Sequence, residues 1–566
     1  MNNNSNPDGI PAPSHAKRIV IIGAVAAGTS AAAKARRNDE TAEIVLYEMD
    51  EHISYSGCGL PYYIGGRVEK LSDLTPRDAA FFKKKYRVDV LVRHQVLRID
   101  PTTKTLVVRN MTDNTEFTDH YDVLVISTGA TAVIPPIPGA NGPHVFTLRN
   151  PLSAKAIRQY IEGLQPQTAV VIGSGFIGLE MVDNLVHAGL SVTLIEKLPA
   201  ICPFVDPDMA PHLHQYLEKQ HITVIPGATV SEITPSHVIL GGSVQIPAEL
   251  VILAVGIRPN TSLATACGVQ LGSTGAIAVN TRMQTNIPDI YSCGDCTESY
   301  SIVDGRPLYR PLGSTANKTG RITGDAITGG NLTFRGIAGT GIFKVFEMSI
   351  AACGLSESQA RESGYDVVIS HNIKPDKPEY FGGREMIIKA IADRKTEKLL
   401  GVQIIGYEGV DKRIDVFVTA ISAGLLVSDL FHLDLAYAPP FSTTKDPVMY
   451  TGMILDNAIN QGRELISAEE LIEASGDGMQ IIDARSEKNY LENHVDDAVH
   501  IPHESLREQM DTLDREKPVV TYCNKGVTGN AAQNILLHSG FKKVYNLSGG
   551  NTQYQAFRKY RKHKDQ

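Results

Sequence analysis

Features of membrane and secreted proteins are missing from the sequence. No apolar run approaches the roughly 18 to 20 residues that span a bilayer, and the polar segment 1–17 lacks the hydrophobic stretch of a secretory signal. The seven cysteines are an odd number, which suits reduced thiols better than a disulfide framework. We therefore expect a soluble, cytoplasmic protein that does not bind membranes.

Excess positive charge is also missing. The 54 lysines and arginines are outnumbered by 62 aspartates and glutamates, which gives a formal net charge of -8. This balance provides no basic field for non-specific nucleic-acid binding, so no nucleic acid is expected as a partner. Hydrophobic residues make up 42% of the chain and charged residues 20%, which is enough apolar material for packed cores.

The 566 residues correspond to about four folding units of roughly 150 residues each. The predicted fold class is α/β with two Rossmann-like dinucleotide-binding domains, because the pattern of apolar run, glycine turn and helical stretch occurs twice. The predicted divisions are a disordered tail at 1–16, a first nucleotide-binding domain at 17–150 and 255–335, a second at 151–254, an α+β domain at 336–461 and a further α/β domain at 462–566.

Two glycine-rich turns carry the nucleotide-binding signal. The first turn, 23–28, matches G-x-G-x-x-G except that Val25 replaces the middle glycine, and Glu48 ends the next apolar run. The second turn, 173–178, is complete and is followed by Glu196. A pyrophosphate binds the free N–H groups at such a helix start, and the acidic residue accepts from a ribose hydroxyl. Glu196 favours NADH over NADPH, although the neighbouring Lys197 weakens that preference.

Further segments point to a flavin. The apolar runs 121–130 and 248–260 contain glycine turns, and the segment 285–295 enters a glycine and Asp295. With these segments the chain resembles the flavoprotein disulfide reductases that bind two dinucleotides. The resemblance implies FAD and NADH as cofactors, with NADPH possible, and no metal site. The implied FAD contacts are Gly23, Ala26, Gly28, Glu48, Thr128, Gly129, Asp295 and Ala316, and the implied nicotinamide-nucleotide contacts are Gly173, Gly175, Gly178, Glu196 and Gly256.

Cys58 is the strongest candidate for a redox residue. It stands between two glycines, and Pro61 suits the first turn of a following helix. A thiol at a helix N-terminus is expected to have a lowered pKa, because the dipole favours the thiolate that attacks disulfides. Cys293 and Cys296 have the C-x-x-C spacing of a redox pair, but they lie inside the flavin segment and are interpreted as packing residues.

A single cysteine at this place cannot form an internal disulfide, whereas the dithiol reductases of the family carry C-x-x-x-x-C. It must therefore pair with an external thiol or be oxidised to a sulfenic acid. Coenzyme A (CoA) disulfide reductases use the first route, and NADH oxidases and peroxidases use the second. Peroxidase-type members place a histidine in the first glycine turn, where this chain has alanines and Val25.

The segments GAVAAGTSAAAKARR, GVDKRID and AYAPPFS are similar to the CoA disulfide reductases. By that resemblance, Ser30, Arg37 and Ser54 contact CoA as a bound ligand or mixed disulfide. Tyr437, with Tyr380 as a second candidate, reaches the active site from the partner subunit of a homodimer. The phenols would donate to the departing CoA thiolate.

The last domain resembles a rhodanese. Cys523 ends an apolar run, and the loop 524–529 precedes a helical stretch, so successive N–H groups would stabilise a thiolate or persulfide. Asp483 and Arg485 are expected to brace the domain. Lys525 is the only cation of the loop, which favours a neutral or larger persulfide donor over thiosulfate.

The favoured function is an NADH-dependent FAD enzyme that reduces CoA persulfides, polysulfides or CoA disulfides through Cys58, while Cys523 handles sulfane sulfur. One alternative is an NADH oxidase or peroxidase that uses a Cys58 sulfenate. Another is a non-catalytic sulfur carrier or redox sensor. The preferred sulfur substrate stays open, as does the question of whether Cys58 and Cys523 communicate within one subunit or across the dimer.

Overall fold

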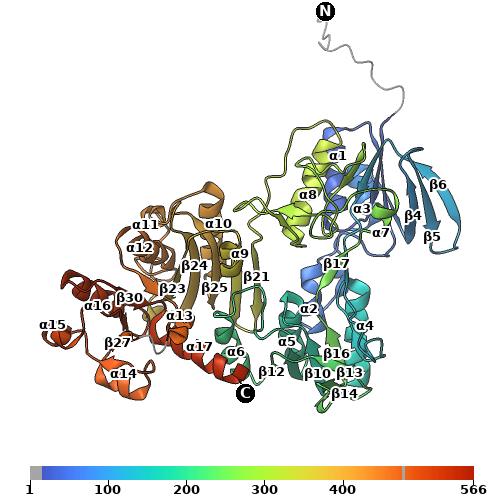
Figure 1. Ribbon diagram of the computed structural model, residues 1–566. Coiled ribbons are helices and arrows are strands. Elements are labelled where there is room, and N and C mark those ends of the chain that lie inside the picture. Colours follow the sequence, from blue (N-terminus) through green and yellow to red (C-terminus); the bar gives the residue numbers. More distant parts are fainter. Residues whose placement is uncertain (1–15, 475–477, 566) are drawn as a thin grey trace, which may run out of the picture.

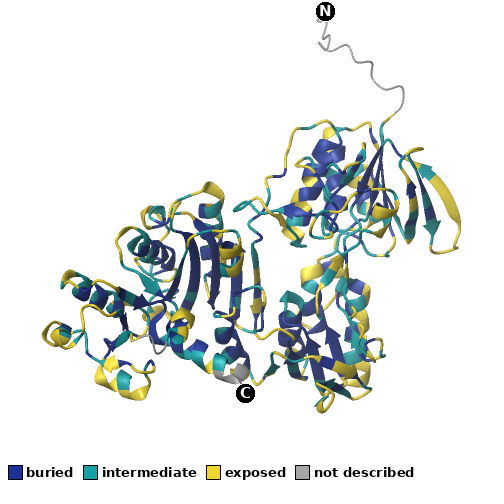
Figure 2. Ribbon diagram, in the orientation of Figure 1, coloured by how far each residue is buried: buried dark blue, intermediate teal, exposed yellow. Residues whose placement is uncertain are grey.

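The computed structural model describes residues 16–474 and 478–565 (Figure 1). The expected disordered tail 1–16 lies almost wholly outside these residues. Within them, no helix has the length and apolar character needed to cross a membrane. All seven cysteines are free thiols. The central strands of the larger sheets are buried, as Figure 2 shows, and the predicted α/β fold class is confirmed.

The first nucleotide-binding unit is built on a five-stranded parallel sheet. In spatial order its strands are β18 (Ile290–Ser292), β7 (Val123–Ile126), β1 (Arg18–Ile22), β2 (Glu43–Glu48) and β3 (Asp89–Val92). Helix α1 (Ala26–Asn38) packs on α8 (Gly313–Ala326), where a Cβ at Gly320 or Gly324 would come within 2.3 Å of a carbonyl oxygen of α1. These glycines allow the two helices to lie in close contact. The peripheral elements are α3 (Ala79–Tyr86), β4 (His94–Asp100), β5 (Thr105–Asn110), β6 (Glu116–His120) and α7 (Ser262–Ala266).

The second nucleotide-binding unit repeats this plan. Its parallel strands are, in spatial order, β12 (Thr223–Ile225), β11 (Ser191–Ile195), β10 (Thr168–Ile172), β16 (Leu250–Leu253) and β9 (Val145–Phe146). Its helices are α4 (Pro151–Leu164), α5 (Phe176–His187) and α6 (Ala210–Lys219), and its antiparallel strands are β13 (Val230–Ile233), β14 (His237–Leu240) and β15 (Val244–Pro247). Asn150 caps α4 with a reciprocal hydrogen-bonded box, which fixes where this unit begins its first helix.

The third unit is an antiparallel sheet covered by helices. Its strands are, in spatial order, β21 (Gly341–Val345), β22 (Met348–Gly354), β25 (Leu399–Gly406), β24 (Glu385–Asp393) and β23 (Val367–Pro375). Its helices are α9 (Glu357–Glu362), α10 (Val410–Ala423), α11 (Asp429–His432) and α12 (Pro447–Asn460). Strand β23 is the edge of this sheet, and α12 contacts it.

The fourth unit is again a parallel sheet between helices. Its strands are, in spatial order, β26 (Leu465–Ile466), β30 (Val544–Leu547), β29 (Val519–Tyr522), β27 (Gln480–Asp483) and β28 (Val499–His500). Its helices are α13 (Ala468–Glu473), α14 (Glu487–Glu492), α15 (Leu506–Gln509), α16 (Val527–His538) and α17 (Gly550–Asp565). This unit packs against the edge strand β23 and against α6.

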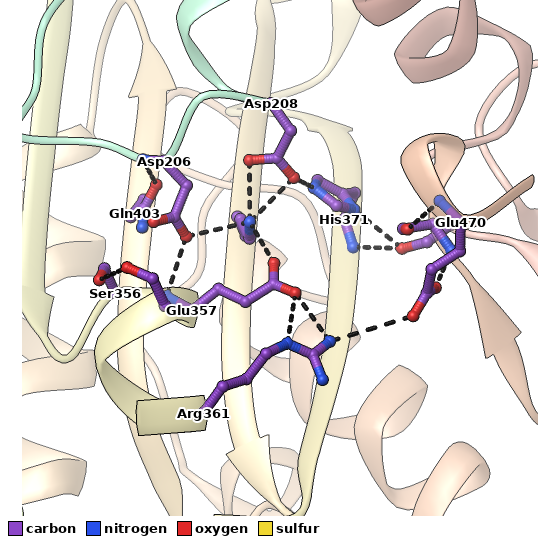
Figure 3. A network of polar contacts seen from close by, with 12 residues as sticks. Asp206, Asp208, Ser356, Glu357, Arg361, His371, Gln403 and Glu470 are labelled. Atoms are coloured by element: carbon purple, nitrogen blue, oxygen red, sulfur yellow. Dashed lines mark hydrogen bonds and ion pairs between the residues drawn. The ribbon is translucent and has the colours of Figure 1, made fainter. Parts of the chain in front are cut away.

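A buried polar network joins three of the units (Figure 3). Lys389 of β24 is 1% exposed and forms ion pairs with Asp206, Asp208 and Glu357 at 2.8–3.0 Å. His371 of β23 bonds to the Asp208 carboxylate at 2.8 Å, and its backbone N–H donates to the Ser548 hydroxyl of the fourth unit at 2.7 Å. One lysine therefore neutralises carboxylates from two units at the point where the fourth unit docks.

Candidate active site

The first glycine turn requires glycine at two positions because backbones cross there. A Cβ at Gly23 would lie 2.2 Å from the Ser127 carbonyl oxygen, and Gly23 has a φ of +101°. A Cβ at Gly28 would lie 1.9 Å from the Gly23 carbonyl oxygen. Val25, the N-cap of α1, adopts φ -94° and ψ -120° and offers no side-chain cap, so the first N–H groups of the helix are available to a ligand.

The second turn has the same crossings and one further opening. A Cβ at Gly173 would lie 2.5 Å from the Ala254 carbonyl oxygen, and one at Gly178 would lie 2.0 Å from the Gly173 carbonyl oxygen. At Gly175, the N-cap of α5, an added Cβ would meet no protein atom within 4 Å. The glycine at this position is therefore not required by protein packing, which fits close approach of a pyrophosphate.

The two acidic residues are held over the turns that they follow. Glu48 accepts from the Ala24 N–H at 2.8 Å and from the Asp50 N–H at 3.0 Å. Glu196 accepts from the backbone N–H and the hydroxyl of Ser174 at 2.9 and 2.6 Å. Burial raises the pKa of Glu48, and its backbone hydrogen bonds oppose that rise. Both carboxylates thus stand where a ribose hydroxyl would lie beside each turn.

The predicted cofactor contacts Thr128, Gly129 and Gly256 lie where the chain passes between the two nucleotide-binding units. Thr128 donates to the Asn260 carbonyl at 2.6 Å, and Gly129 and Gly256 have φ values of +69° and +118° beside the paired strands β8 (Ala130–Ala132) and β17 (Ile257–Pro259). These segments connect the two nucleotide-binding units.

Two further predicted FAD contacts, Asp295 and Ala316, lie beside Gly294 near the start of α1. Arg149 donates to the Asp295 carboxylate at 2.9 Å. Ala316 is buried in the first turn of α8, and its Cβ lies 3.9 Å from the position that a Cβ on Gly294 would take. The residues of the first unit therefore offer glycine cradles, an uncapped helix start and a placed carboxylate, which are groups that suit FAD binding.

Cys58 lies where the two nucleotide-binding units meet. It is exposed, in the 3₁₀ turn Gly57–Gly59, and the short helix α2 (Leu60–Ile64) follows with Pro61 in its first turn. The charges that act on its thiol are those of Glu180 on α5, Asp295 in the first unit and Arg149. The thiol is therefore influenced by charged groups of both nucleotide-binding units.

The predicted lowering of the Cys58 pKa is wrong for the single chain, in which the pKa is raised. Loss of solvent around the sulfur raises the pKa of the thiol, and the carboxylates of Glu180 and Asp295 raise it further, although the residue as a whole is exposed. A helix of five residues has too small a dipole to outweigh these effects.

Glu180 is a site residue that the sequence analysis missed. Burial and the nearby Asp183 raise the pKa of its carboxyl to about 7. It stands one turn into α5, which begins at the second glycine turn. Its spacing from Gly178 gives no signal, because a glutamate early in a helix is ordinary; only the fold brings it near Cys58.

The three predicted CoA contacts lie on helix α1 or beside its start. The Ser54 N–H donates to the Ala24 carbonyl at 3.0 Å, just before the helix. Ser30 donates to Asn317 at 2.7 Å, and the Arg37 guanidinium lies 5.5 Å from the centre of the Tyr86 ring. Arg37 lies seven positions after Ser30 in the helix, about 10 Å along the axis. An elongated ligand could therefore contact all three, and their role in binding stays a prediction.

Tyr380 and Tyr437 lie on the third unit and are 75% and 49% exposed. Their loops are connected by Arg413, which the sequence analysis did not identify. Arg413 is 1% exposed and donates to the Asp376 carbonyl at 2.9 Å and to the Asp446 carboxylate at 3.0 Å. It therefore fixes the two tyrosine loops relative to each other.

Cys523 follows β29 and lies before α16. Its sulfur accepts from the Gly526 N–H at 3.2 Å, so at least one donor of the predicted anion-binding loop is directed at it. Arg485 pairs with the fully buried Asp483 and donates to Asn524 at 3.0 Å, which braces the loop. Cys293 and Cys296 are fully buried free thiols, in keeping with a packing role.

Comparisons with known proteins agree with this architecture. The models for the pyridine nucleotide-disulphide oxidoreductase, for its dimerisation domain and for the rhodanese-like domain match residues 17–314, 341–447 and 467–557. The NAD(P)H sulfur oxidoreductase (CoA-dependent) of Pyrococcus furiosus is 36% identical over 451 residues, which cover 78% of this chain and 99% of that protein.

Two solved structures are similar over almost the whole chain. The reduced CoADR-RHD of Bacillus anthracis superposes with a TM-score of 0.94 at 34% identity and covers 96% of this chain and 99% of its own. The NAD-dependent persulfide reductase from A. fulgidus superposes with a TM-score of 0.87 at 37% identity and covers 95% of this chain and 99% of its own. The chain belongs to the pyridine nucleotide-disulphide oxidoreductase family and carries a rhodanese-like domain at its C-terminal end.

Proposed function

We propose that the protein is an NADH-dependent FAD enzyme that reduces CoA persulfides, polysulfides or CoA disulfides at Cys58. The observation that carries the proposal is the position of the Cys58 thiol, whose charge interacts with Glu180 of one nucleotide-binding unit and with Asp295 of the other. The names of the relatives, a CoA-dependent sulfur oxidoreductase and a persulfide reductase, support the same substrate class.

Each of the two glycine turns would bind one of the two dinucleotide cofactors. FAD is held by the first unit, with its pyrophosphate at the start of α1 and a ribose at Glu48. NADH is held by the second unit, where the Glu196 carboxylate would repel the 2′-phosphate of NADPH. When bound, the flavin would supply hydride-transfer chemistry, which the protein's own side chains cannot provide.

Cys58 forms and breaks the covalent bond to substrate. Its thiolate attacks the disulfide of a CoA disulfide; a new bond forms between the Cys58 sulfur and one CoA sulfur, and the other CoA leaves with the electron pair and takes a proton. Two electrons that originate from NADH then cleave the mixed disulfide. Thiolate at Cys58 and a second free CoA thiol result, so the cycle consumes one NADH per disulfide.

A homodimer in the cytoplasm completes the proposed enzyme. The match to the dimerisation model covers 341–447, which includes both exposed tyrosines. Tyr437 of the partner subunit, and Tyr380 of the partner subunit, would donate a proton to the departing CoA thiolate. The seven free thiols suit a reducing compartment.

The rhodanese-like domain is proposed to pass sulfane sulfur to the flavin-linked site. Cys523 would take up sulfur as a persulfide, and Cys58 would release it by reduction. Cys523→Ala is therefore expected to slow polysulfide turnover while leaving CoA disulfide reduction unchanged. Equal polysulfide rates in Cys523→Ala and the unaltered protein would show that the two cysteines are not coupled.

Steady-state oxidation of NADH with different acceptors tests the function. CoA persulfide and CoA disulfide are expected to support turnover, and hydrogen peroxide is not. Preference for peroxide, with a sulfenate at Cys58, would instead assign the oxidase or peroxidase function. No turnover with any sulfur acceptor would favour a carrier or sensor.

A further inference from the structure

The Cys523 loop has one cation, and that cation is already paired. Lys525 forms an ion pair with Glu385, the first residue of β24 in the third unit. Arg485, the other cation that contacts the loop, is paired with the buried Asp483. The fourth unit therefore presents no unpaired cation of its own from these two positions to an anion on the Cys523 sulfur.

A lysine from the third unit stands beside the same loop. Lys374 lies near the end of β23, and its ammonium is 4.3 Å from the centre of the Tyr450 ring on α12. No carboxylate of the described residues forms an ion pair with it. Burial lowers its pKa, the charges of Lys525 and Lys445 lower it further, and only the interaction with Cys523 raises it.

The docking of the fourth unit brings β23 and the Cys523 loop together. The His371 N–H, three residues before Lys374, donates to the Ser548 hydroxyl at 2.7 Å. The Asn551 N–H, three residues after Ser548, donates to the Cys523 carbonyl at 2.8 Å. The Lys525–Glu385 ion pair lies beside these contacts, because Glu385 pairs with Pro375 in the sheet.

We propose that Lys374 completes the Cys523 site from the neighbouring domain and selects an anionic sulfane-sulfur donor. The proposal rests on the proposed sulfur-handling role of Cys523. An unpaired, half-buried ammonium beside a reactive sulfur attracts anions more strongly than a solvated one, because its field is less screened. The expectation of a neutral donor rested on Lys525 as the only cation and is replaced by this assignment.

The transfer balances without an added oxidant. The Cys523 thiolate attacks the outer sulfur of an anionic donor, a bond forms between the two sulfurs, and the donor's sulfur–sulfur bond breaks. The leaving group departs as an anion with the electron pair of that bond, as sulfite does from thiosulfate. The negative charge that remains on the Cys523 persulfide is the charge that Lys374 would hold.

Two alkylating reagents test the local field at Cys523. Iodoacetate is an anion and iodoacetamide is neutral, yet both react with the same thiolate, so the ratio of their rates does not depend on how much thiolate is present. The ratio is measured at Cys523 by peptide mass spectrometry in the full-length protein. Removing a neighbouring positive charge is expected to lower the ratio of the iodoacetate rate to the iodoacetamide rate about fivefold.

The variants are Lys374→Met and Lys374→Gln, with Lys374→Arg to retain the charge. Lys542→Met is the control, because Lys542 is an exposed lysine of the unit that carries Cys523 and is paired with Glu516. The expected result is a lowered ratio in the Met and Gln variants and an unchanged ratio in Lys374→Arg and Lys542→Met. An unchanged ratio in both neutral variants would overturn the proposal.

A second measurement separates this proposal from the proposed function. Persulfide formation at Cys523 is compared for thiosulfate, a dianion, and diallyl trisulfide, a neutral donor. Lys374→Met is expected to reduce labelling by thiosulfate selectively, and equal loss with both donors would contradict the selection of anions. NADH oxidation with CoA disulfide depends on Cys58 and is expected to be the same in all variants. If that reaction fails in the unaltered protein while the selectivity shift persists, the proposed function alone is wrong.

Discussion

The Gly175→Ala variant tests whether glycine is required at position 175 for binding NADH rather than for folding. An added Cβ at Gly175 meets no protein atom within 4 Å, and the residue's φ of -72° and ψ of -174° are accessible to alanine. Alanine is a poorer N-cap than glycine by about 0.5–1 kcal/mol, and it offsets a similar amount by restricting the unfolded chain. The free energy of unfolding is therefore expected to change by less than about 1 kcal/mol.

NADH binding is expected to weaken much more. The methyl group would occupy the space at the start of α5 through which a pyrophosphate reaches the first N–H groups. We expect a rise of at least about tenfold in the dissociation constant for NADH, about 1.4 kcal/mol. The measurement is flavin reduction by NADH in a stopped-flow instrument, with urea unfolding of the same sample.

Gly163→Ala is the matched control, since this exposed glycine in α4 also has no neighbour within 4 Å of an added Cβ. It is expected to leave NADH binding unchanged. Gly178→Ala is the opposite case, because its Cβ would lie 2.0 Å from the Gly173 carbonyl oxygen and should destabilise the unit itself. Unchanged NADH affinity in Gly175→Ala would refute the placement of the pyrophosphate.

Three further predictions follow from buried charges. Arg413→Met leaves the Asp446 carboxylate unpaired and is expected to cost about 3–5 kcal/mol in urea unfolding; a loss below about 1 kcal/mol would contradict the buried pairing. Glu180→Gln is expected to speed iodoacetamide alkylation of Cys58 above pH 7, where the carboxylate with a pKa of about 7 is charged and repels the thiolate, and to change nothing well below pH 7. Lys389→Met is expected to cost about 3–5 kcal/mol at pH 7. Burial raises the pKa of Asp208, but the polar partners of this carboxylate, Lys389 foremost, outweigh this effect and lower it. The stabilisation by the Lys389–Asp208 pair is therefore present above about pH 4 and is lost as the pH falls further. A loss of stability in Lys389→Met that is as large at pH 3 as at pH 7 would contradict this reasoning.

Local sequence patterns were sufficient for the nucleotide-binding units. The apolar run expected before the first glycine turn is β1, and the helical stretch expected after it is α1, which begins within the turn at Ala26. Such units are encoded by neighbours in the chain, namely an apolar strand, a glycine turn and an alanine-rich helix. Their family membership could be inferred for the same reason.

Long-range contacts were beyond the sequence. Arg413 lies in a segment that the family resemblance highlighted, but its role depends on a carboxylate 33 residues away. Lys374 is an ordinary strand residue until the fourth unit docks beside β23. The Cys58 pKa was predicted in the wrong direction because the local helix was considered and the carboxylates brought in by folding were not.

The mass of Cys58 before and after NADH tests the central claim most directly. The protein is incubated with CoA disulfide, freed of excess reagent and divided, and one half receives NADH without oxygen. The account predicts a CoA adduct on the Cys58 peptide in the first half and a free thiol with released CoA in the second. An unmodified Cys58 in a preparation that still oxidises NADH with CoA disulfide would contradict it.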